Sequence, residues 1–399
     1  MIMKILFVVE SCLRINTSAN LCHLAYIRGA VEAGYDVDVI SITNQDTAID
    51  KSINLPDGVN WIYVDPPRHS NSFNTTIGSR KKVERNKINN LKECLLAMAK
   101  AIIKIIYGVY GRTPSLWVRE ASKYKSEIKY DYCISLATPF ISHKLAANLI
   151  NRGNIDCSQF IEIWEDPWTL DLFNKQDKRA TIKEERRLLS YADKIIYVSP
   201  LTLKYQQELF PEYRAKMLWH PLPYYYLQDK DIKPPEETTF GYYGDYFSFS
   251  RNLRPFYEAA KLTEIRVNIF GNTDENFKST NKIIVRPRVD LKTLNAAEDE
   301  TSVYVFLCNL KGGQIPGKIY QNSASKKHIL FILDGTDEEK KILRKFFEQF
   351  NRYEFCDNDI ESISKSIRRI VNGESKSICE PIVAFSPKKT MEYILEGNI

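Results

Sequence analysis

The stretch SVYVFLCNLKGGQIPGKIYQNSASKKHILFIL, residues 302–333, decides the fold. Its apolar runs predict strands at 302–310 and 327–333, and two glycines and a helix near 317–325 lie between them. Pro316 suits the first turn of that helix, where a missing N–H costs no hydrogen bond. A strand, a helix and a second strand in this order form a unit that builds a parallel sheet.

Strands and helices alternate in the same way along the whole chain. Near-continuous apolar strands suit a sheet that helices cover on both faces, so the predicted fold class is α/β and doubly wound. The predicted strands are 4–9, 37–42, 59–64, 131–137, 159–164, 194–199 and 215–220, then 238–244, 265–271 and 281–287. The other predicted helices lie near 18–33, 141–152, 180–192, 252–262, 290–299, 336–349, 359–372 and 387–396.

A proline-rich segment divides the two series. Residues 221–237 contain four prolines and a cluster of charges, which is typical of a hinge. We therefore predict two Rossmann-like lobes, residues 1–222 and 223–385, and a last segment at 386–399. Sheets of this kind bind ligands at the carboxyl ends of their strands, which predicts a site in a central cleft.

Composition excludes several classes of protein. The 399 residues are 44% hydrophobic, and 56 Lys and Arg against 50 Asp and Glu give a net charge of +6, too mild for a dedicated nucleic-acid binder. No two of the eight cysteines form a Cys-x-x-Cys pair. The start, MIMKILFVVESC, lacks a signal-peptide pattern, and no run of about 18 apolar residues predicts a membrane span. We expect a reducing, cytoplasmic location.

The glycine turn before the helix at 317–325 has the character of an anion site. Exposed backbone N–H groups at a helix start, together with Lys318, suit a phosphate. Gly312, Gly317 and Lys318 match most of the P-loop pattern, but Ile319 stands where that pattern needs a hydroxyl for magnesium. A glycine turn with a solvated Lys318 is the alternative.

This stretch resembles the donor-site region of GT-B glycosyltransferases of the family-four type (glycosyl transferases group 1), which assemble bacterial glycans. Their pattern PxKxYEYLAxGKPIL is matched here by Pro316, Lys318, Tyr320, Gln321, Ala324, Lys327, Ile329 and Leu330. KILFVV (4–9), ERRLLSYADKIIYVSP (185–200) and FGYYGDYFSFSRN (240–252) extend the resemblance over the chain. It implies an acceptor-side first lobe, a nucleotide-sugar second lobe, and a last helix that packs back on the first lobe.

The resemblance also implies a set of donor-binding residues. The family's ribose-binding carboxylate is replaced here by Gln321, which lacks the charge. Arg251 is the match for the family's diphosphate-binding cation, with Arg254 as a substitute, because a guanidinium is always charged and binds phosphate bidentately. A solvated Arg251 is the alternative. Arg288 lies in the RPRV loop (286–289), where the family reads the nucleobase. The predicted donor-binding residues are Arg251, Arg254, Arg288, Gly313, Pro316, Lys318 and Gln321.

The acceptor side is predicted from two strand ends and one loop. In FIEIWEDPW (160–168), Glu165 or Asp166 would be the base if the reaction inverts the anomeric centre, and both would only position the acceptor if it retains. An acidic turn capped by aromatic residues is the alternative. Thr138 ends a neighbouring strand. Thr17 and Asn20 lie in a first loop without glycine, which also argues against a dinucleotide-binding dehydrogenase.

A basic segment is the last feature with a predicted partner. Residues 80–112 carry nine Lys and Arg and two Glu, and part of the segment is helical in period. Such a helix can lie on an anionic membrane surface, which would suit a lipid-linked acceptor. A helix packed on the first lobe, with its lysines in water, is the alternative. We predict no nucleic-acid partner.

The predicted function is transfer of a hexose-type sugar from a nucleotide-diphosphate sugar to a hydroxyl of a glycan or lipid-linked glycan in surface polysaccharide assembly. No cofactor and no metal is predicted, because the Asp-x-Asp pairs at 36–38 and 357–359 lie away from the phosphate motif. A nucleotide-sugar epimerase of the same fold is one alternative. A degenerate scaffold is the other, favoured by Gln321 and the glycine-poor first loop.

Overall fold

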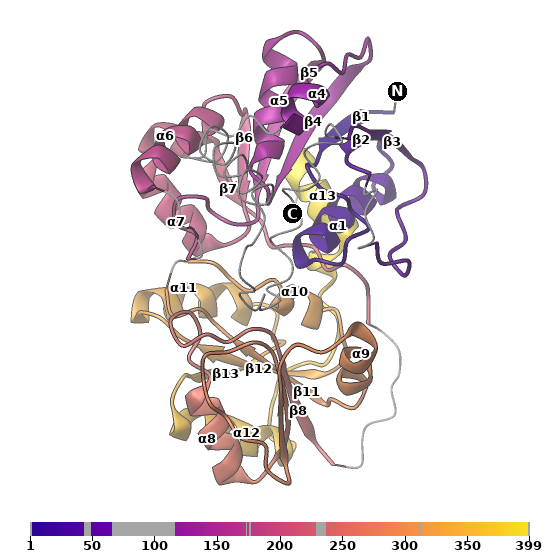
Figure 1. Cartoon of the computed structure of the whole chain (residues 1–399). Coiled ribbons are helices and arrows are strands. Elements are labelled where there is room, and N and C mark those ends of the chain that lie inside the picture. Colours follow the sequence, from indigo (N-terminus) through magenta and orange to yellow (C-terminus); the bar gives the residue numbers. More distant parts are fainter. Residues whose placement is uncertain are drawn as a thin grey trace, which may run out of the picture. The chain divides into compact units, whose positions relative to one another are not determined.

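The computed structural model describes residues 2–43, 49–65, 116–172, 174, 177–228, 237–311 and 313–397 (Figure 1). The chain divides into two compact units, Met1–Ile196 with Phe210–Leu218, and Tyr197–Leu209 with Trp219–Ile399. The basic segment 80–112 lies outside the described residues, so its predicted membrane contact stays a prediction. The packing of the last helix on the first lobe also stays a prediction.

The first unit is built on a seven-stranded sheet of order β3-β2-β1-β4-β5-β6-β7. Its strands are β1 (Lys4–Val8), β2 (Asp36–Ser41), β3 (Val59–Tyr63), β4 (Lys129–Ala137), β5 (Asp156–Trp164), β6 (Lys194–Tyr197) and β7 (Met217–Trp219). β1 pairs in parallel with both β2 and β4, with Ile5 opposite Val37 and Tyr132. The strand order therefore reverses between β1 and β4, and the crevice at their carboxyl ends is where such sheets bind ligands.

Helices cover this sheet as the alternation of the sequence predicts. They are α1 (Ser18–Glu32), α4 (Leu116–Ala121), α5 (Ile141–Asn151) and α6 (Lys178–Leu189), with a 3₁₀ turn, η2 (Pro211–Lys216). Thr17 caps α1 by accepting from the Asn20 N–H, and Asp177 caps α6 by accepting from the Ala180 N–H. β1 is buried from Ile5 to Val8, so the sheet core lies between covering layers.

The second unit is built on a six-stranded sheet of order β10-β9-β8-β11-β12-β13. Its strands are β8 (Thr239–Tyr243), β9 (Arg266–Phe270), β10 (Ile283–Arg286), β11 (Val303–Leu307), β12 (His328–Leu333) and β13 (Glu354–Asp357). The pairings of β8 with β9 and with β11 are parallel, with Phe240 opposite Val267 and Val303. Here the strand order reverses between β8 and β11.

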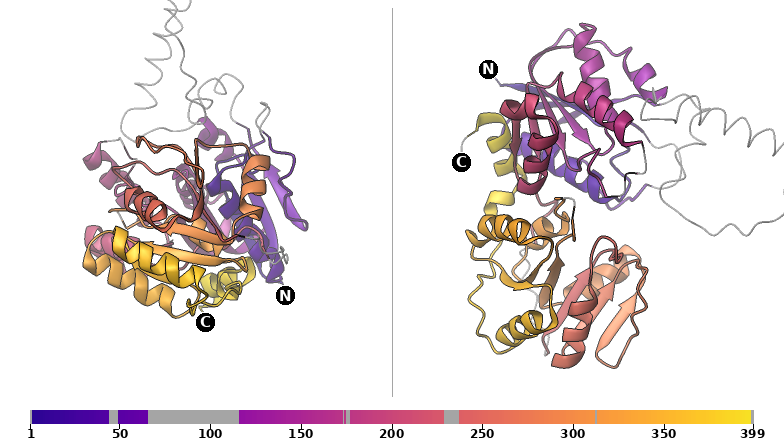
Figure 2. Two further views of the ribbon diagram at one scale, coloured as in Figure 1. Left: turned by 90° about the horizontal axis from the view of Figure 1, so that it is seen from below. Right: turned by 90° about the vertical axis from the view of Figure 1, so that its left-hand side faces the viewer.

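Helices cover the second sheet on both faces. The helices of the second unit are α7 (Pro200–Leu209), α8 (Arg254–Thr263), α9 (Leu291–Asp299), α10 (Lys318–Asn322), α11 (Asp337–Glu348), α12 (Ile360–Val371) and α13 (Pro387–Glu396), with a 3₁₀ turn, η3 (Val383–Phe385). α8 and α12 lie side by side on one face (Figures 1 and 2), where Phe256 and Ile367 join Ile269 and Leu330 of the sheet in one core. An aromatic cluster around Phe331 and Phe347 fills the other face.

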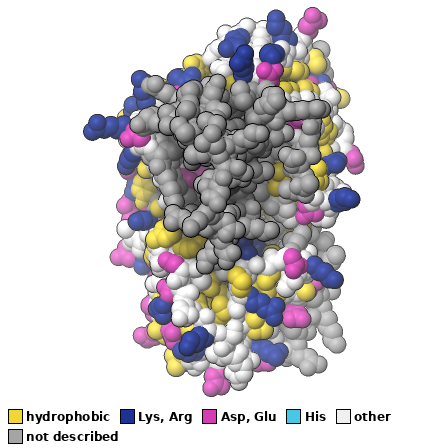
Figure 3. Space-filling model, in the orientation of Figure 1, with side chains coloured by type: hydrophobic (Ala, Val, Ile, Leu, Met, Phe, Trp, Pro, Cys, Tyr) yellow, Lys and Arg dark blue, Asp and Glu magenta, His cyan; other side chains and the backbone are white. Residues whose placement is uncertain are grey.

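Two features of the structure can be compared with the composition: the distribution of charge on the surface and the length and hydrophobicity of the helices. On the face shown in Figure 3, acidic and basic side chains intermingle over the described surface, as the near balance of 56 basic and 50 acidic residues suggests. Among the helices that fall within the described ranges, none has the length and apolar character needed to cross a bilayer.

Candidate functional site

A small pocket lies where the strand order of the second sheet reverses. It has a volume of about 40 Å³, and the ends of β8 and β11 form its walls with the start of α10. A volume of this size holds roughly three water molecules, or a compact polar group such as a phosphate. The lining residues are Gly241, Tyr242, Tyr243, Gly244, Arg251, Val305, Phe306, Leu307, Pro316, Lys318 and Asn322.

Arg251 enters this pocket from the loop that follows β8. Its Nε donates to Asn309 Oδ1 at 2.7 Å, and its Nη1 donates to the Asp245 backbone oxygen at 2.8 Å. Both acceptors are neutral, and among the described residues no carboxylate pairs with this guanidinium. The positive charge is thus held in a fixed direction without being neutralised, which is the arrangement that an anionic ligand needs.

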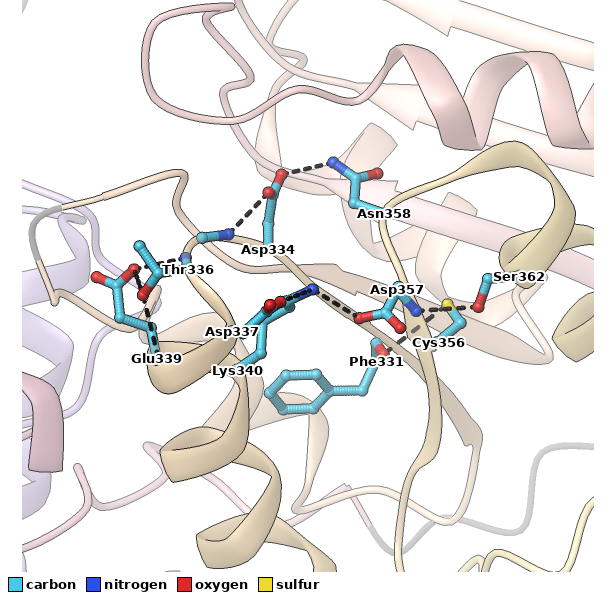
Figure 4. A network of polar contacts seen from close by, with 11 residues as sticks. Phe331, Asp334, Thr336, Asp337, Glu339, Lys340, Cys356, Asp357, Asn358 and Ser362 are labelled. Atoms are coloured by element: carbon cyan, nitrogen blue, oxygen red, sulfur yellow. Dashed lines mark hydrogen bonds and ion pairs between the residues drawn. The ribbon is translucent and has the colours of Figure 1, made fainter.

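The loop that carries Arg251 is tied to the neighbouring strand ends. Asn358, just after β13, donates through Nδ2 to Asp334 Oδ2 at 2.6 Å (Figure 4). The same amide also donates to the Asn252 backbone oxygen at 2.9 Å. Asn309 donates in turn to the Gln314 backbone oxygen at 3.1 Å. Together with the Arg251–Asn309 bond, these bonds hold the loop after β8 against the loops that follow β11, β12 and β13.

Lys318 approaches the same pocket as the first residue of α10. Its Nζ lies 3.2 Å from Glu298 of α9, and its side chain is 44% exposed. The ammonium also lies 5.9 Å from the centre of the Tyr243 ring, a cation–π distance. Because the lysine of this pair is solvent-exposed, Lys318 can turn from Glu298 toward a bound phosphate.

The other two predicted arginines have carboxylate partners. Arg288 binds both oxygens of Asp245, at 3.0 and 2.9 Å, and Asp245 is the residue whose backbone oxygen holds Arg251. Asp245 therefore links Arg288 to the pocket. Arg254 instead pairs with Glu275, is 54% exposed and is not among the pocket's lining residues.

The side-chain amide of Gln321 is hydrogen-bonded to the backbone of the same chain. Its Oε1 accepts from the Tyr225 N–H at 2.9 Å, and its Nε2 donates to the Tyr226 backbone oxygen at 2.8 Å. The amide thus holds the segment 224–228 beside α10. A ribose could replace these bonds only if that segment moved, so the structure gives Gln321 a structural task at the position where the resemblance implies a ligand contact.

Gly313 also has a structural task. Its φ of +74° is in the left-handed region, and a Cβ there would lie 2.9 Å from the Tyr205 ring. Its backbone oxygen accepts from Ser199 Oγ at 2.7 Å and from Thr202 Oγ1 at 3.1 Å. The residue fixes the turn that leads to Pro316, and it does not line the pocket.

In the first unit, the predicted acidic turn gathers at the carboxyl edge of the sheet. Glu165 and Asp166 follow β5, and Thr138 follows β4 and donates through Oγ1 to Asp166 Oδ2 at 3.4 Å. Glu165 is 7% exposed, and its Oε1 lies 3.3 Å from His23 Nε2 of α1. Burial, reinforced by the charge of Asp166, raises the pKa of Glu165 well above its ordinary value.

Thr17 and Asn20 hold the first loop together. Thr17 caps α1, as described above, and Asn20 accepts from Ser11 Oγ at 2.6 Å. Asn20 also donates to the backbone oxygens of Cys12 and Ile15, at 3.0 and 2.8 Å. Polar bonds thus hold this glycine-free loop together, and the predicted acceptor contacts of Thr17 and Asn20 stay predictions.

No protein-family model matches the sequence, and no curated protein matches it. Among solved structures, the chain resembles TarM with a TM-score of 0.57 and 10% identity, over 99% of this chain and 96% of TarM. It resembles a glycosyltransferase of Rickettsia africae ESF-5 with a TM-score of 0.54 and 12% identity, over 98% and 92%. It also resembles HepE of Anabaena in complex with UDP-glucose, with a TM-score of 0.52 and 10% identity, over 98% and 94%. The chain has the GT-B fold. That prediction is confirmed.

Proposed function

We propose that the chain is a glycosyltransferase that holds the diphosphate of a nucleotide sugar in the pocket of the second unit. The observation that carries the proposal is the guanidinium of Arg251, which two neutral acceptors aim into a pocket that Lys318 also lines. Two cations at a strand-order reversal suit a diphosphate better than a neutral ligand. HepE, which has the same fold, is known in complex with UDP-glucose.

The two cations would act on the leaving group. When the bond from the anomeric carbon to the diphosphate breaks, negative charge grows on the diphosphate oxygens, and fixed positive charge stabilises it. Arg251 needs no reorganisation because Asn309 and Asp245 already hold it. Lys318 exchanges Glu298 for a phosphate oxygen. Because these side chains supply the charge, we propose transfer that does not depend on a metal.

The acidic turn of the first unit would bind the acceptor. A carboxylate next to Thr138 can accept a hydrogen bond from an incoming hydroxyl and orient its oxygen toward the anomeric carbon. We propose a glycan or lipid-linked glycan as the acceptor, with the protein in the cytoplasm and segment 80–112 at the membrane surface. A hexose as the transferred unit belongs to the same proposal.

A screen for thermal stabilisation tests the donor proposal. A nucleotide that binds only the folded chain, at a free concentration of one hundred times its Kd, raises the free energy of unfolding by about 2.7 kcal/mol. We expect UDP, GDP or one of their sugars to raise Tm, and Arg251→Ala to abolish the increase. Arg266→Ala is the matched control, because Arg266 lies at the amino end of β9 and pairs with Glu237. A panel in which no nucleotide raises Tm would contradict the proposal.

One observation favours a second candidate, a catalytically degenerate scaffold. The amide of Gln321, at the position of the family's ribose-binding carboxylate, is occupied by the backbone of segment 224–228. Nucleotide binding with no turnover over a panel of acceptors would favour the scaffold. Turnover of the donor with no acceptor present would instead favour the epimerase alternative.

A further inference from the structure

Two ionisable side chains of the first unit form a buried pair that the proposed mechanism has not used. His23 of α1 and Glu165 after β5 have exposed fractions of 0% and 7%, and 3.3 Å separates His23 Nε2 from Glu165 Oε1. Among the described residues, neither nitrogen of His23 has a conventional hydrogen bond. The two groups therefore depend on one another for a polar partner.

Such a pair is stable only when its net charge is zero. A lone buried charge is costly, so either the carboxyl is protonated beside a neutral imidazole, or a carboxylate faces an imidazolium. Both forms hold one proton in total. Burial lowers the pKa of His23 to about 3 and raises the pKa of Glu165, which favours the form with the proton on Glu165.

Within the part of the chain that the structure describes, the groups around the pair supply no competing positive charge. Cys22, also on α1, faces Glu165 and Asp166, and burial raises the pKa of its thiol well above the ordinary value. His143 of α5 faces His23, its Nδ1 lies 2.6 Å from Ser135 Oγ, and burial lowers its pKa to about 3. Asp166 is the neighbouring acid on the turn. All three groups favour a neutral His23–Glu165 pair.

We infer that Glu165 shares a single proton with His23 and positions the acidic turn, and that Asp166, next to Thr138, is the carboxylate that meets the acceptor hydroxyl. This inference rests on the proposed function for the role of Asp166, but the shared proton does not. In the transfer, the acceptor oxygen bonds to the anomeric carbon, and the bond from that carbon to the diphosphate breaks with its electron pair on the diphosphate. The hydroxyl proton passes to Asp166 if the reaction inverts, or to the released phosphate if it retains.

Proton linkage to unfolding tests the pair without any assay of transfer. The unfolded chain binds no proton at Glu165 or His23 above about pH 7.5, whereas the folded pair holds one. The unfolding equilibrium constant of the wild type should therefore rise more steeply with pH above 7.5 than that of Glu165→Gln, by up to tenfold more per pH unit. Glu184→Gln is the control, because Lys144 and Arg187 keep that carboxylate charged in the folded state and its slope should match the wild type. Equal slopes for Glu165→Gln and the wild type would overturn the inference.

Transfer kinetics test the division of roles, once a donor and an acceptor are known. If Asp166 takes the hydroxyl proton, Asp166→Asn should lower kcat at least 100-fold. Glu165→Gln, which keeps a neutral buried pair of the same shape, should lower kcat at least tenfold less than Asp166→Asn does at pH 7. A loss in Glu165→Gln as large as that in Asp166→Asn would overturn the assignment. UDP or GDP binding in the same variants separates this result from a failure of the proposed function, because both variants should keep the wild-type affinity.

Discussion

Replacing Gly271 by alanine tests the close approach of two loops beside the pocket. Gly271 follows β9, and a Cβ there would lie 1.9 Å from the backbone oxygen of Gly244 and 2.6 Å from its carbonyl carbon. Real Cβ atoms essentially never approach closer than 3.0 Å, and the obstacle is backbone, which no side-chain rotation can move. The two loops must therefore part by about 1 Å, a distortion at the upper end of the roughly 1–3 kcal/mol of ordinary overpacking.

Urea and thermal denaturation of the full chain give the measurement. We expect Gly271→Ala to lower the free energy of unfolding by about 3 kcal/mol and Tm by roughly 6–12 °C, for a unit of about 200 residues. The matched control is Gly244→Ala, because the nearest atom to its added Cβ is Tyr242 Oη at 3.9 Å. The control should lose less than about 1 kcal/mol. If the two variants are equally stable, the loops that follow β8 and β9 do not meet as described.

Three further predictions concern charge and hydrogen bonding. Burial raises the pKa of Glu162 to about 8, so folding favours its protonated form and the free energy of unfolding falls as pH rises from about 4.5 through 8. In urea denaturation, Glu162→Gln should remove this fall, which amounts to a few kcal/mol of unfolding free energy between pH 5 and 9. If the difference in unfolding free energy between the wild type and Glu162→Gln does not change with pH, the prediction is contradicted. Gln321→Ala should increase hydrogen exchange at least tenfold in segment 224–228, and unchanged exchange would show that the amide does not hold it. Arg288→Ala leaves the Asp245 carboxylate without its cation beside the pocket, so UDP or GDP affinity should fall several-fold, and more at low salt, by calorimetry.

Most of the fold follows from the sequence because its strands are apolar and buried. Each of the twelve predicted strands corresponds to a strand of the structure. β13 was missed because Glu354–Asp357 is only four residues long and has an acid at each end. Glu354 is buried there because Arg369 and Ser375 satisfy its carboxylate, and a local pattern cannot reveal such a partner. The helix predicted near 317–325 is shorter in the structure, Lys318–Asn322.

The candidate site was only partly predictable for a related reason. Arg251 could be selected because it matches the diphosphate-binding cation that the resemblance implies, and Lys318 because it stands at the start of a helix after a glycine turn and matches the same family pattern. The partners that orient Arg251 come from Asn309 and from the backbone of Asp245, and this depends on how two loops meet. Likewise, nothing in the sequence around His23 distinguishes it from an ordinary core histidine. Only the packing of α1 against the end of β5 brings it to Glu165.

Isothermal titration of UDP and GDP against the wild type and against the Arg251→Ala, Lys318→Ala double variant tests the central claim most directly. The wild type should bind at least one nucleotide, and the double variant should bind it at least 100-fold more weakly, because two charge-assisted contacts to the diphosphate are lost. Arg266→Ala should bind as the wild type does. A double variant with wild-type affinity would show that these cations do not hold the diphosphate and would contradict the account.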